Sequence, residues 1–364
     1  MATYVLIKGA DWLVEGASGI AFKFGLPKII VGATIVSLGT TSPEAAVSVT
    51  AAWNGNAGLA LGNAVGSVIA DTGLIFGLGC ILCVLPADRF VLKRQGWVQF
   101  GSAVLLAIAC YVAFAMQGAE ASLGRGVGVV CLVLLAGYMW ISVKWSRQHA
   151  KLEALELEQN QAATITEKNA NGSGGDSEAD DDFEADLTDE LLEESKKHTA
   201  LFLGWLVFIG LVLVIVGSHV MVESAGQLAL RIGIPEVVIA GTLVAFGTSA
   251  PELVVGITAI RKKHPELLIG NVIGADILNV LFVIGASAVA TPLDIIAPEG
   301  KIPEIFLILH LPAMLLILLL FRVFIFRASG TGAFERWMGW PLLAIYVIYT
   351  VLGFVLSADL PAAH

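Results

Sequence analysis

The sequence predicts an all-α membrane protein with ten transmembrane helices, built as two inverted five-helix repeats whose helices are broken near the bilayer midplane. Its composition, the spacing of its apolar runs and an internal repeat support this fold class. Of 364 residues, 57% are hydrophobic and only 14% are charged, whereas a soluble domain carries about a quarter charged residues. The 39 glycines are typical of closely packed membrane helices.

The apolar runs are close to twenty residues long, the length that an α-helix needs to cross a bilayer. They are continuous rather than alternating, which argues against the strands of a membrane β-barrel. In the first half the expected spans are 2–24, 28–52, 57–83, 97–117 and 122–146. In the second half they are 200–228, 236–260, 265–291, 303–326 and 337–357.

The net charge of −10 comes from one segment between the halves. Residues 147–198 hold 15 acidic and five basic residues, so the rest of the chain is neutral. We predict a first repeat at 1–146, an acidic and largely disordered loop at 147–198, and a second repeat at 199–364. Residues 148–160 can extend the preceding helix. Weak regulatory Ca²⁺ binding by Asp176 and 180–182 stays an alternative, although the segment lacks a full EF-hand loop.

The distribution of Lys and Arg predicts the orientation in the membrane. With the N-terminus outside, 17 of the 21 basic residues fall on one side of the membrane, and an excess of basic residues marks the cytoplasmic side. We therefore expect a multi-pass protein of the cell (inner) membrane, with both termini outside and the acidic loop in the cytoplasm. We further expect a monomer in contact with the lipid bilayer, with no nucleic-acid partner.

An internal repeat appears when the sequence is shifted by 208 residues. Between positions 27 and 79, about 16 of 53 residues are identical to their shifted counterparts, mostly at Gly, Pro, Thr, Asn and Glu. Because each half has an odd number of spans, the second copy enters the membrane from the opposite side. Inverted repeats are common in secondary transporters, whose sites lie at the midplane between the copies.

Each repeat carries one motif that combines a proline with a buried acid, GTTSPE at 39–44 and GTSAPE at 247–252. Glu44 and Glu252 fall near the bilayer centre, where a charge costs roughly 2.5–3.5 kcal/mol, so both are functional candidates. The proline of each motif leaves the carbonyl four residues earlier without its helical partner. Carbonyls, hydroxyls and carboxylates are hard oxygen ligands that suit Na⁺ and Ca²⁺ rather than zinc or copper.

A second polar set lies on the helix that follows each motif. Asp71 and Asn279 fall at the middle of these helices, and Ser67 lies one turn before Asp71 on the same face. Asp276 precedes Asn279 by three residues. Two roles stay open for Asp276: a fourth acid of the same site, or a cap for a neighbouring helix.

These residues carry a resemblance to a known family. GTTSPE…GNAVGSVIAD and GTSAPE…GNVIGADILN resemble the two α-repeats of the cation/Ca²⁺ exchanger superfamily, in its Na⁺/Ca²⁺ exchanger branch with ten-helix microbial members. The segments GADWLVEGAS and GSHVMVESAG are similar to the gating helices of that family. The resemblance implies an electrogenic antiporter without a cofactor, in which Na⁺ entry drives Ca²⁺ export by alternating access.

The resemblance also implies the roles of individual residues. Glu44 and Glu252 would coordinate Ca²⁺ together with the carbonyls of Thr40 and Thr248. Oxygens for Na⁺ would come from Thr41, Ser249, Ser67, Ser37 and Ala245. Asp71 and Asn279 match the last positions of the second motif in each repeat, and Asp276 is a further candidate ligand.

The sequence departs from the family pattern at three positions. The microbial exchangers carry Asn in the first repeat and Asp in the second, whereas here Asp71 and Asn279 are exchanged, and Ala275 replaces a Ser. Stoichiometry and coupling to K⁺ or H⁺ therefore stay open. The alternatives are a Ca²⁺/H⁺ or K⁺-dependent Na⁺/Ca²⁺ exchanger of the same fold and, from another class, a cation channel. We do not expect an enzyme, because no nucleophile–base set or nucleotide loop appears.

Overall fold

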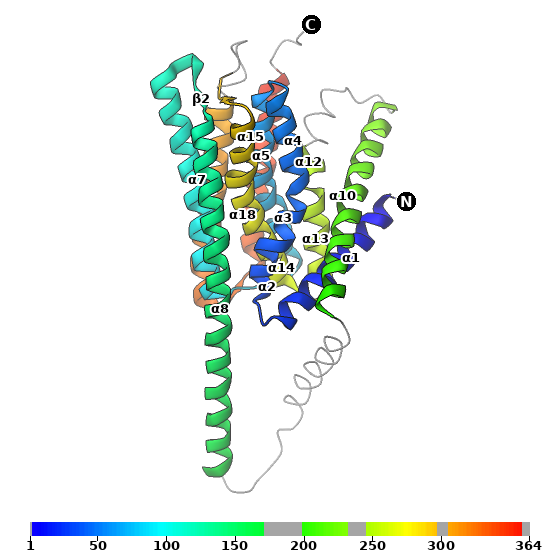
Figure 1. The fold of residues 1–364 in the computed structure, drawn as a ribbon, viewed down its shortest axis with the longest axis vertical. Helices are drawn as coiled ribbons and strands as arrows, with labels where there is room; N and C mark the ends of the chain where they lie inside the picture. The colour runs from blue at the N-terminus through cyan, green and yellow to red at the C-terminus, as the bar shows by residue number, and fades with distance from the viewer. Residues whose placement is uncertain (1, 171–198, 232–244, 297–304, 359–364) are drawn as a thin grey trace.

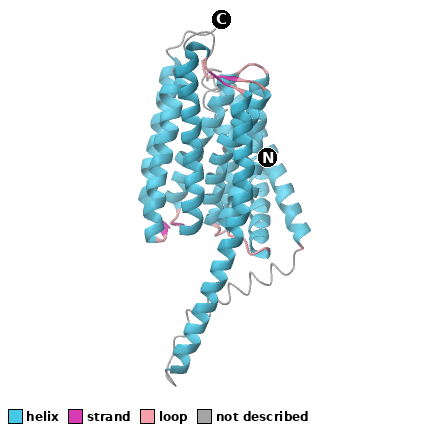
Figure 2. Ribbon diagram, turned by 60° about the vertical axis from the view of Figure 1, so that its left-hand side comes forward, coloured by secondary structure: helices cyan, strands magenta, loops and turns pink. Residues whose placement is uncertain are grey.

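The computed structural model describes residues 2–170, 199–231, 245–296 and 305–358. Most of these residues lie in long helices that run roughly side by side (Figures 1 and 2). The all-α prediction is therefore confirmed. The strands found in the described residues are four segments of two residues each.

The elements of the first half have the following bounds: α1 Ala2–Lys23, α2 Lys28–Val31, η1 Gly32–Val36, α3 Ser37–Thr40, α4 Ser42–Trp53, α5 Ala57–Ala70, η2 Asp71–Phe76, α6 Gly77–Leu82, β1 Leu85–Pro86, α7 Arg89–Gln117, η3 Gly118–Glu120, β2 Ser122–Leu123 and α8 Arg125–Ala170. Those of the second half are α10 Ala200–Arg231, α12 Ala245–Thr248, α13 Ala250–Arg261, α14 Pro265–Leu278, η5 Asn279–Val283, α15 Ile284–Ala290, β3 Leu293–Asp294, η6 Phe306–His310, α17 Leu311–Thr331, β4 Ala333–Phe334, η7 Arg336–Met338 and α18 Gly339–Ala358.

Seven helical stretches in the described residues are long and apolar enough to cross a membrane, so the chain is a multi-pass membrane protein. They are 57–82, 89–117, 125–149, 200–221, 265–290, 306–331 and 336–356. Of the other three predicted spans, 2–24 is the helix α1, which carries several charges. The span 28–52 is broken at Thr41, and 236–260 is described only from Ala245. The count of ten stays a prediction.

The small strands support the inverted repeat. β1 pairs antiparallel with β4, and β2 pairs antiparallel with β3. The shift of 208 residues carries β1 onto β3, and β2 and β4 each follow the fourth long helix of their half. The α7 helix separates β1 from β2 along the chain, so the two pairs lie at opposite ends of the bundle. Each pair joins one half of the protein to the other.

The stretches 57–82 and 265–290 form the centre of the bundle. Within their most apolar windows, 72% and 94% of residues are buried, compared with 11–44% for the other five apolar stretches. Each central stretch contains a π-helical turn, η2 or η5, and the two turns begin 208 residues apart. A Cβ atom on Gly32 would lie only 2.7 Å from the carbonyl oxygen of Leu267, so α14 and η1 approach backbone to backbone.

The helices α1 and α10 pack against each other at one side of the bundle, with α1 strongly tilted (Figure 1). Glycines line their contact. A Cβ atom on Gly9 would lie 2.7 Å from the backbone nitrogen of Val214, and one on Gly217 would lie 2.8 Å from that of Leu6. These two helices contain the sequences that resemble gating helices, and the close backbone contact makes them a paired unit.

The α8 helix continues well beyond the bundle (Figures 1 and 2). Its end at Ala170 lies inside the predicted acidic insert and ten residues past the predicted helical extension. The remainder of the insert, 171–198, lies outside the described residues. The suggested Ca²⁺-binding residues Asp176 and 180–182 therefore fall outside them too.

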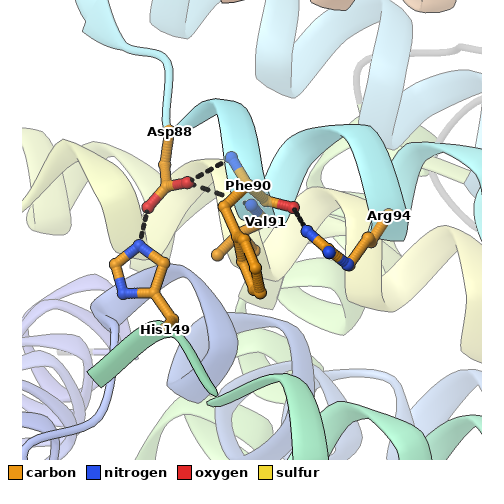
Figure 3. A network of polar contacts seen from close by, with 5 residues as sticks. All are labelled: Asp88, Phe90, Val91, Arg94 and His149. Atoms are coloured by element: carbon orange, nitrogen blue, oxygen red, sulfur yellow. Dashed lines mark hydrogen bonds and ion pairs between the residues drawn. The ribbon is translucent and has the colours of Figure 1, made fainter. Parts of the chain in front are cut away.

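A polar network holds α8 to the start of α7 where α8 leaves the bundle (Figure 3). Asp88 caps α7, because its Oδ1 accepts hydrogen bonds from the backbone N–H groups of Phe90 and Val91 at 2.8 and 2.9 Å. Its Oδ2 lies 2.5 Å from Nε2 of His149. Burial alone would raise the pKa of Asp88, but the contact with His149 and the two amides outweigh burial and lower it.

Candidate functional site

The two proline motifs interrupt their helices at equivalent places, as the sequence predicts. The first break falls at Thr41, between α3 and α4, and the second falls 208 residues later at Ser249, between α12 and α13. Pro43 and Pro251 lie in the first turn of the second helix of each pair, where a missing N–H costs little. Because proline cannot donate, the carbonyl four residues before it, that of Gly39 or of Gly247, lacks its normal helical donor.

Glu44 and Glu252 lie in the first turns of α4 and α13, and each is only 1% exposed. Oε1 of Glu252 accepts a hydrogen bond of 3.5 Å from Oγ1 of Thr41, which links the two halves. Oε2 of Glu252 and both carboxylate oxygens of Glu44 have no hydrogen-bond partner in the described part of the chain. Buried carboxylates are normally paired or bound to a cation, so these oxygens are available as ligands.

Two mirrored hydrogen bonds tie each broken helix to the central helix of the other half. Oγ1 of Thr40 donates to Oδ1 of Asn271, and Oγ1 of Thr248 donates to Oδ1 of Asn63, both at 3.3 Å. Nδ2 of Asn63 also donates to the backbone oxygen of Glu44 at 3.4 Å. Asn63 and Asn271 belong to the motifs GNAVGSVIAD and GNVIGADILN, but they are not among the predicted ligands, because their hydrogen-bond partners lie in the other repeat.

Asp71 and Asn279 meet between the two central helices. Each is the first residue of a π-helical turn and is 1% exposed. Nδ2 of Asn279 donates to Oδ2 of Asp71 at 3.5 Å. Oδ1 of Asp71 and Oγ of the buried Ser67 have no hydrogen-bond partner among the described residues. The exchanged pair therefore occupies mirrored positions, with the acid supplied by the first repeat.

The remaining predicted ligands lie on the same broken helices. Ser37 is fully buried in α3, and Oγ of the buried Ser249 has no partner in the described residues. Ala245 is the first residue of α12, and its side chain lies outside the described part.

Three acids concentrate negative charge at this site, because Glu44 lies within electrostatic reach of both Glu252 and Asp71. No ion pair joins them to a basic side chain in the described residues. No three His, Cys, Asp or Glu side chains there converge closely enough to cage a metal by themselves. Hydroxyl, amide and main-chain oxygens must therefore complete any shell of six to eight ligands around Ca²⁺.

The hydrogen bonds of Asp276 in the described residues do not involve Glu44, Glu252 or Asp71. Oδ2 of Asp276 accepts a hydrogen bond of 2.6 Å from Oγ1 of Thr72 and one of 2.5 Å from Nε2 of Gln99. No backbone N–H of a described helix donates to it, so the capping role has no support. The sequence analysis did not identify Thr72 and Gln99 as partners of Asp276. Thr72 directly follows Asp71 but lies in the other repeat from Asp276, and Gln99 lies on α7, far from both motifs in the chain.

Of the paired helices, α10 contacts the site through the polar side chain of Ser218. Oγ of the buried Ser218 in α10 donates a hydrogen bond of 3.2 Å to the backbone oxygen of Gly247. This is the carbonyl that Pro251 leaves without a helical donor. A movement of α10 would therefore change the hydrogen bonding of a carbonyl at the second break.

Comparisons with known proteins agree with this arrangement. Residues 1–144 and 202–355 match the family described as "Sodium/calcium exchanger protein". The sodium/calcium exchanger MaX1 of Methanosarcina acetivorans is 31% identical over 96% of this chain and 95% of its own length. The inner membrane protein YrbG of Escherichia coli is 30% identical over 93% of this chain and 96% of its own length.

The fold is also similar to a solved structure. The sodium-calcium exchanger NCX_Mj, soaked with 2.5 mM Na⁺ and 10 mM Sr²⁺, superposes with a TM-score of 0.70 at 25% identity. The similarity covers 99% of this chain and 97% of the other.

Proposed function

This chain belongs to the sodium/calcium exchanger family, and from that premise we propose that it is a secondary active antiporter that exchanges Na⁺ for Ca²⁺ by alternating access. It is a multi-pass membrane transporter rather than an enzyme. We further propose that Na⁺ entry drives Ca²⁺ export from the cell. The observation that carries the proposal is a buried group of three acids, of which Glu44 and Glu252 lie at the two mirrored helix breaks and Asp71 lies on a central helix.

The charges explain how exchange can arise. Glu44, Glu252 and Asp71 carry three negative charges away from water, so the site needs cations in order to stay charged. Ca²⁺ would bind between Glu44 and Glu252 with the carbonyl oxygens of the breaks. Several Na⁺ ions would use the same carboxylates and the neighbouring hydroxyls. Because the two ions compete for shared oxygens, binding of one favours release of the other.

The neutral oxygens favour Na⁺ over H⁺ as the counter-ion. A proton needs only a carboxylate, whereas Na⁺ needs several oxygen ligands. The buried hydroxyls of Ser67 and Ser249 have no hydrogen-bond partner among the described residues, so both can act as ligands. A proton exchanger would not need these two hydroxyls as ligands.

The moving part in this proposal is the pair of helices α1 and α10. Their backbone contact through Gly9 and Gly217 allows them to slide as one unit. Their link to the second helix break is the hydrogen bond from Ser218 to Gly247. Sliding would open the site first to one side of the membrane and then to the other, as in other inverted-repeat transporters.

We propose that the end of the bundle from which α8 extends faces the cytoplasm. The connections and helix ends on this side carry most of the basic residues, including Arg89, Lys93 and Arg94 in the first turns of α7, which is the expected bias for the cytoplasmic side. Single cysteines placed near Ala170 and near Gly118 should be labelled from opposite sides of intact membranes.

Ca²⁺ flux in proteoliposomes tests the function. The purified protein should take up Ca²⁺ when the vesicles are loaded with Na⁺, and Glu44→Gln should abolish this uptake. Uptake driven by a pH gradient without Na⁺ would support the Ca²⁺/H⁺ alternative, and a requirement for K⁺ would support the K⁺-dependent one. Current that follows only the Ca²⁺ gradient, with no countertransport, would indicate a channel. Wild-type uptake in Glu44→Gln would refute the assigned site.

A further inference from the structure

A second buried polar cluster lies beside the central site, formed by Asp276 of α14, Thr72 of η2 and Gln99 of α7. All three side chains are nearly inaccessible, at 1%, 0% and 2% exposure. Thr72 and Gln99 both donate to Oδ2 of Asp276 and hold its carboxylate in one orientation. Asp276 lies within electrostatic reach of Asp71 but makes no hydrogen bond to the central residues in the described part of the chain.

This cluster breaks the symmetry of the repeat. The shift of 208 residues carries Asp276 back onto Val68, and it carries Thr72 forward onto Val280. The mirrored copy of this position is therefore apolar in the other repeat. By contrast, the central residues keep polar partners under the same shift, as in the mirrored Thr–Asn hydrogen bonds. The cluster is therefore specific to one copy of the repeat, whereas the ion-exchange site proposed above uses equivalent positions of both copies.

The charge of Asp276 lacks compensation. Its Oδ1 is buried and has no hydrogen-bond partner in the described residues, and no basic side chain there forms an ion pair with it. One turn before Gln99 on the same face of α7, the fully buried amide of Gln95 also has no partner among the described residues. A carboxylate at this depth stays ionised only with a positive charge beside it.

We propose that Asp276, Thr72 and Gln99 form an off-axis subsite for one monovalent metal cation, Na⁺ or K⁺. One carboxylate balances one positive charge, whereas a divalent ion would leave an excess charge in a dry environment. The ligands are the carboxylate of Asp276, Oγ1 of Thr72 and the amide oxygen of Gln99. A half-turn of the Gln99 amide presents this oxygen in place of its nitrogen, since the two ends have the same shape.

The subsite is separate from the exchange chemistry proposed above, so its test can be separated from that chemistry. The variant carrying both Glu44→Gln and Glu252→Gln removes two acids of the central site and leaves Asp276 intact. The measurement is thermal unfolding of this purified variant in detergent at constant ionic strength, with N-methyl-D-glucamine replaced stepwise by Na⁺ or K⁺. We expect a saturable rise in Tm with at least one of the two cations.

Substitutions in the cluster then identify the subsite. Asp276→Asn should abolish the response, and Thr72→Val should raise the half-saturating cation concentration about tenfold or more, as losses of supporting residues at metal sites do. Thr258→Val is the matched control, because Thr258 is also buried but lies on α13. If the double variant does not fold, Thr72→Val and Asp276→Asn are compared in the otherwise wild-type protein at saturating Ca²⁺.

Three results would overturn the proposal: no response to either cation, a response that survives Asp276→Asn, or a Tm that depends on pH but not on Na⁺ or K⁺. The last result would mean that a proton occupies Asp276. The Na⁺ and K⁺ titrations show which cation binds. A failure of Na⁺/Ca²⁺ exchange in the flux assay would leave a positive result here intact, because the double variant does not depend on exchange.

Discussion

Glu252→Gln should remove most of the stabilisation that Ca²⁺ gives to this protein. The change keeps the size of the side chain and an oxygen that can accept from Thr41, but it deletes the negative charge. Removing one partner of a buried ion pair costs about 3–5 kcal/mol. Because about 1.4 kcal/mol corresponds to a factor of ten, the Kd for Ca²⁺ should rise by two orders of magnitude or more.

The size of the effect on thermal stability follows from this change in Kd. At a Ca²⁺ concentration of 100 times the wild-type Kd, a ligand stabilises the folded state by ~2.7 kcal/mol. With a Kd raised about a hundredfold, the same concentration gives ~0.4 kcal/mol. At roughly 2 °C per kcal/mol for a chain of this size, the Ca²⁺-dependent rise in Tm should fall from about 5 °C to below about 1 °C.

The assay is thermal unfolding of the purified protein with increasing Ca²⁺, in detergent and without Na⁺. Glu335→Gln is the matched control. Glu335 lies outside the apolar stretches, and its carboxylate accepts a hydrogen bond from Trp337, so this variant should keep the full response. A Glu252→Gln protein with the wild-type rise in Tm and the wild-type half-saturation would refute the assignment of Glu252 as a ligand.

Three further predictions concern the surroundings of the site. Ser218→Ala removes one neutral hydrogen bond, worth ~0.5–1.5 kcal/mol. It should shift the population away from this conformation by up to about tenfold, as measured by spin-label distances between α10 and α13. Burial and the charge of Lys28 lower the pKa of His264 to about 4, so the unfolded chain binds more protons below pH ~6.5 and stability falls as the pH drops from there towards 4. Lys28→Met should raise this pKa, measured by NMR, and reduce the loss of Tm over the same pH range; an unchanged pKa would contradict the assigned cause. Gly210→Ala should lower the free energy of unfolding by ~1–3 kcal/mol, because its Cβ would lie 2.5 Å from a backbone atom of α1, whereas Gly204→Ala, in open space, should have little effect.

The sequence predicted the features that depend on local rules. Proline disrupts a helix through its own ring and its missing N–H, so the two breaks could be placed within the motifs 39–44 and 247–252. A carboxylate in an apolar span is costly wherever the chain folds, which is why Glu44, Glu252 and Asp71 were identified as candidates. These three acids could therefore be identified without knowledge of any tertiary contact.

The features that the sequence did not predict depend on contacts between distant segments. The Asn63–Thr248 and Asn271–Thr40 bonds join residues 185 and 231 positions apart, and no local pattern indicates such a pairing. The same holds for Gln99, whose partner is 177 residues away. The α8 helix ends at Ala170, ten residues later than the predicted extension. The acidic composition of the segment obscured a run rich in Ala, Leu, Glu and Gln, which are strong helix formers.

The interleaved packing of the two repeats has a consequence for biogenesis. The most buried stretch, 265–290, lies in the second half of the chain, and its helix α14 packs its backbone against η1 of the first repeat. The strand pairs β1–β4 and β2–β3 also need both repeats. During synthesis the first repeat therefore lies in the membrane without its partner helices until the second repeat has been inserted. Over that time its acids lack the contacts that the partner helices provide. A ribosome that stalls before residue 290 would leave a chain that quality-control proteases should recognise and degrade.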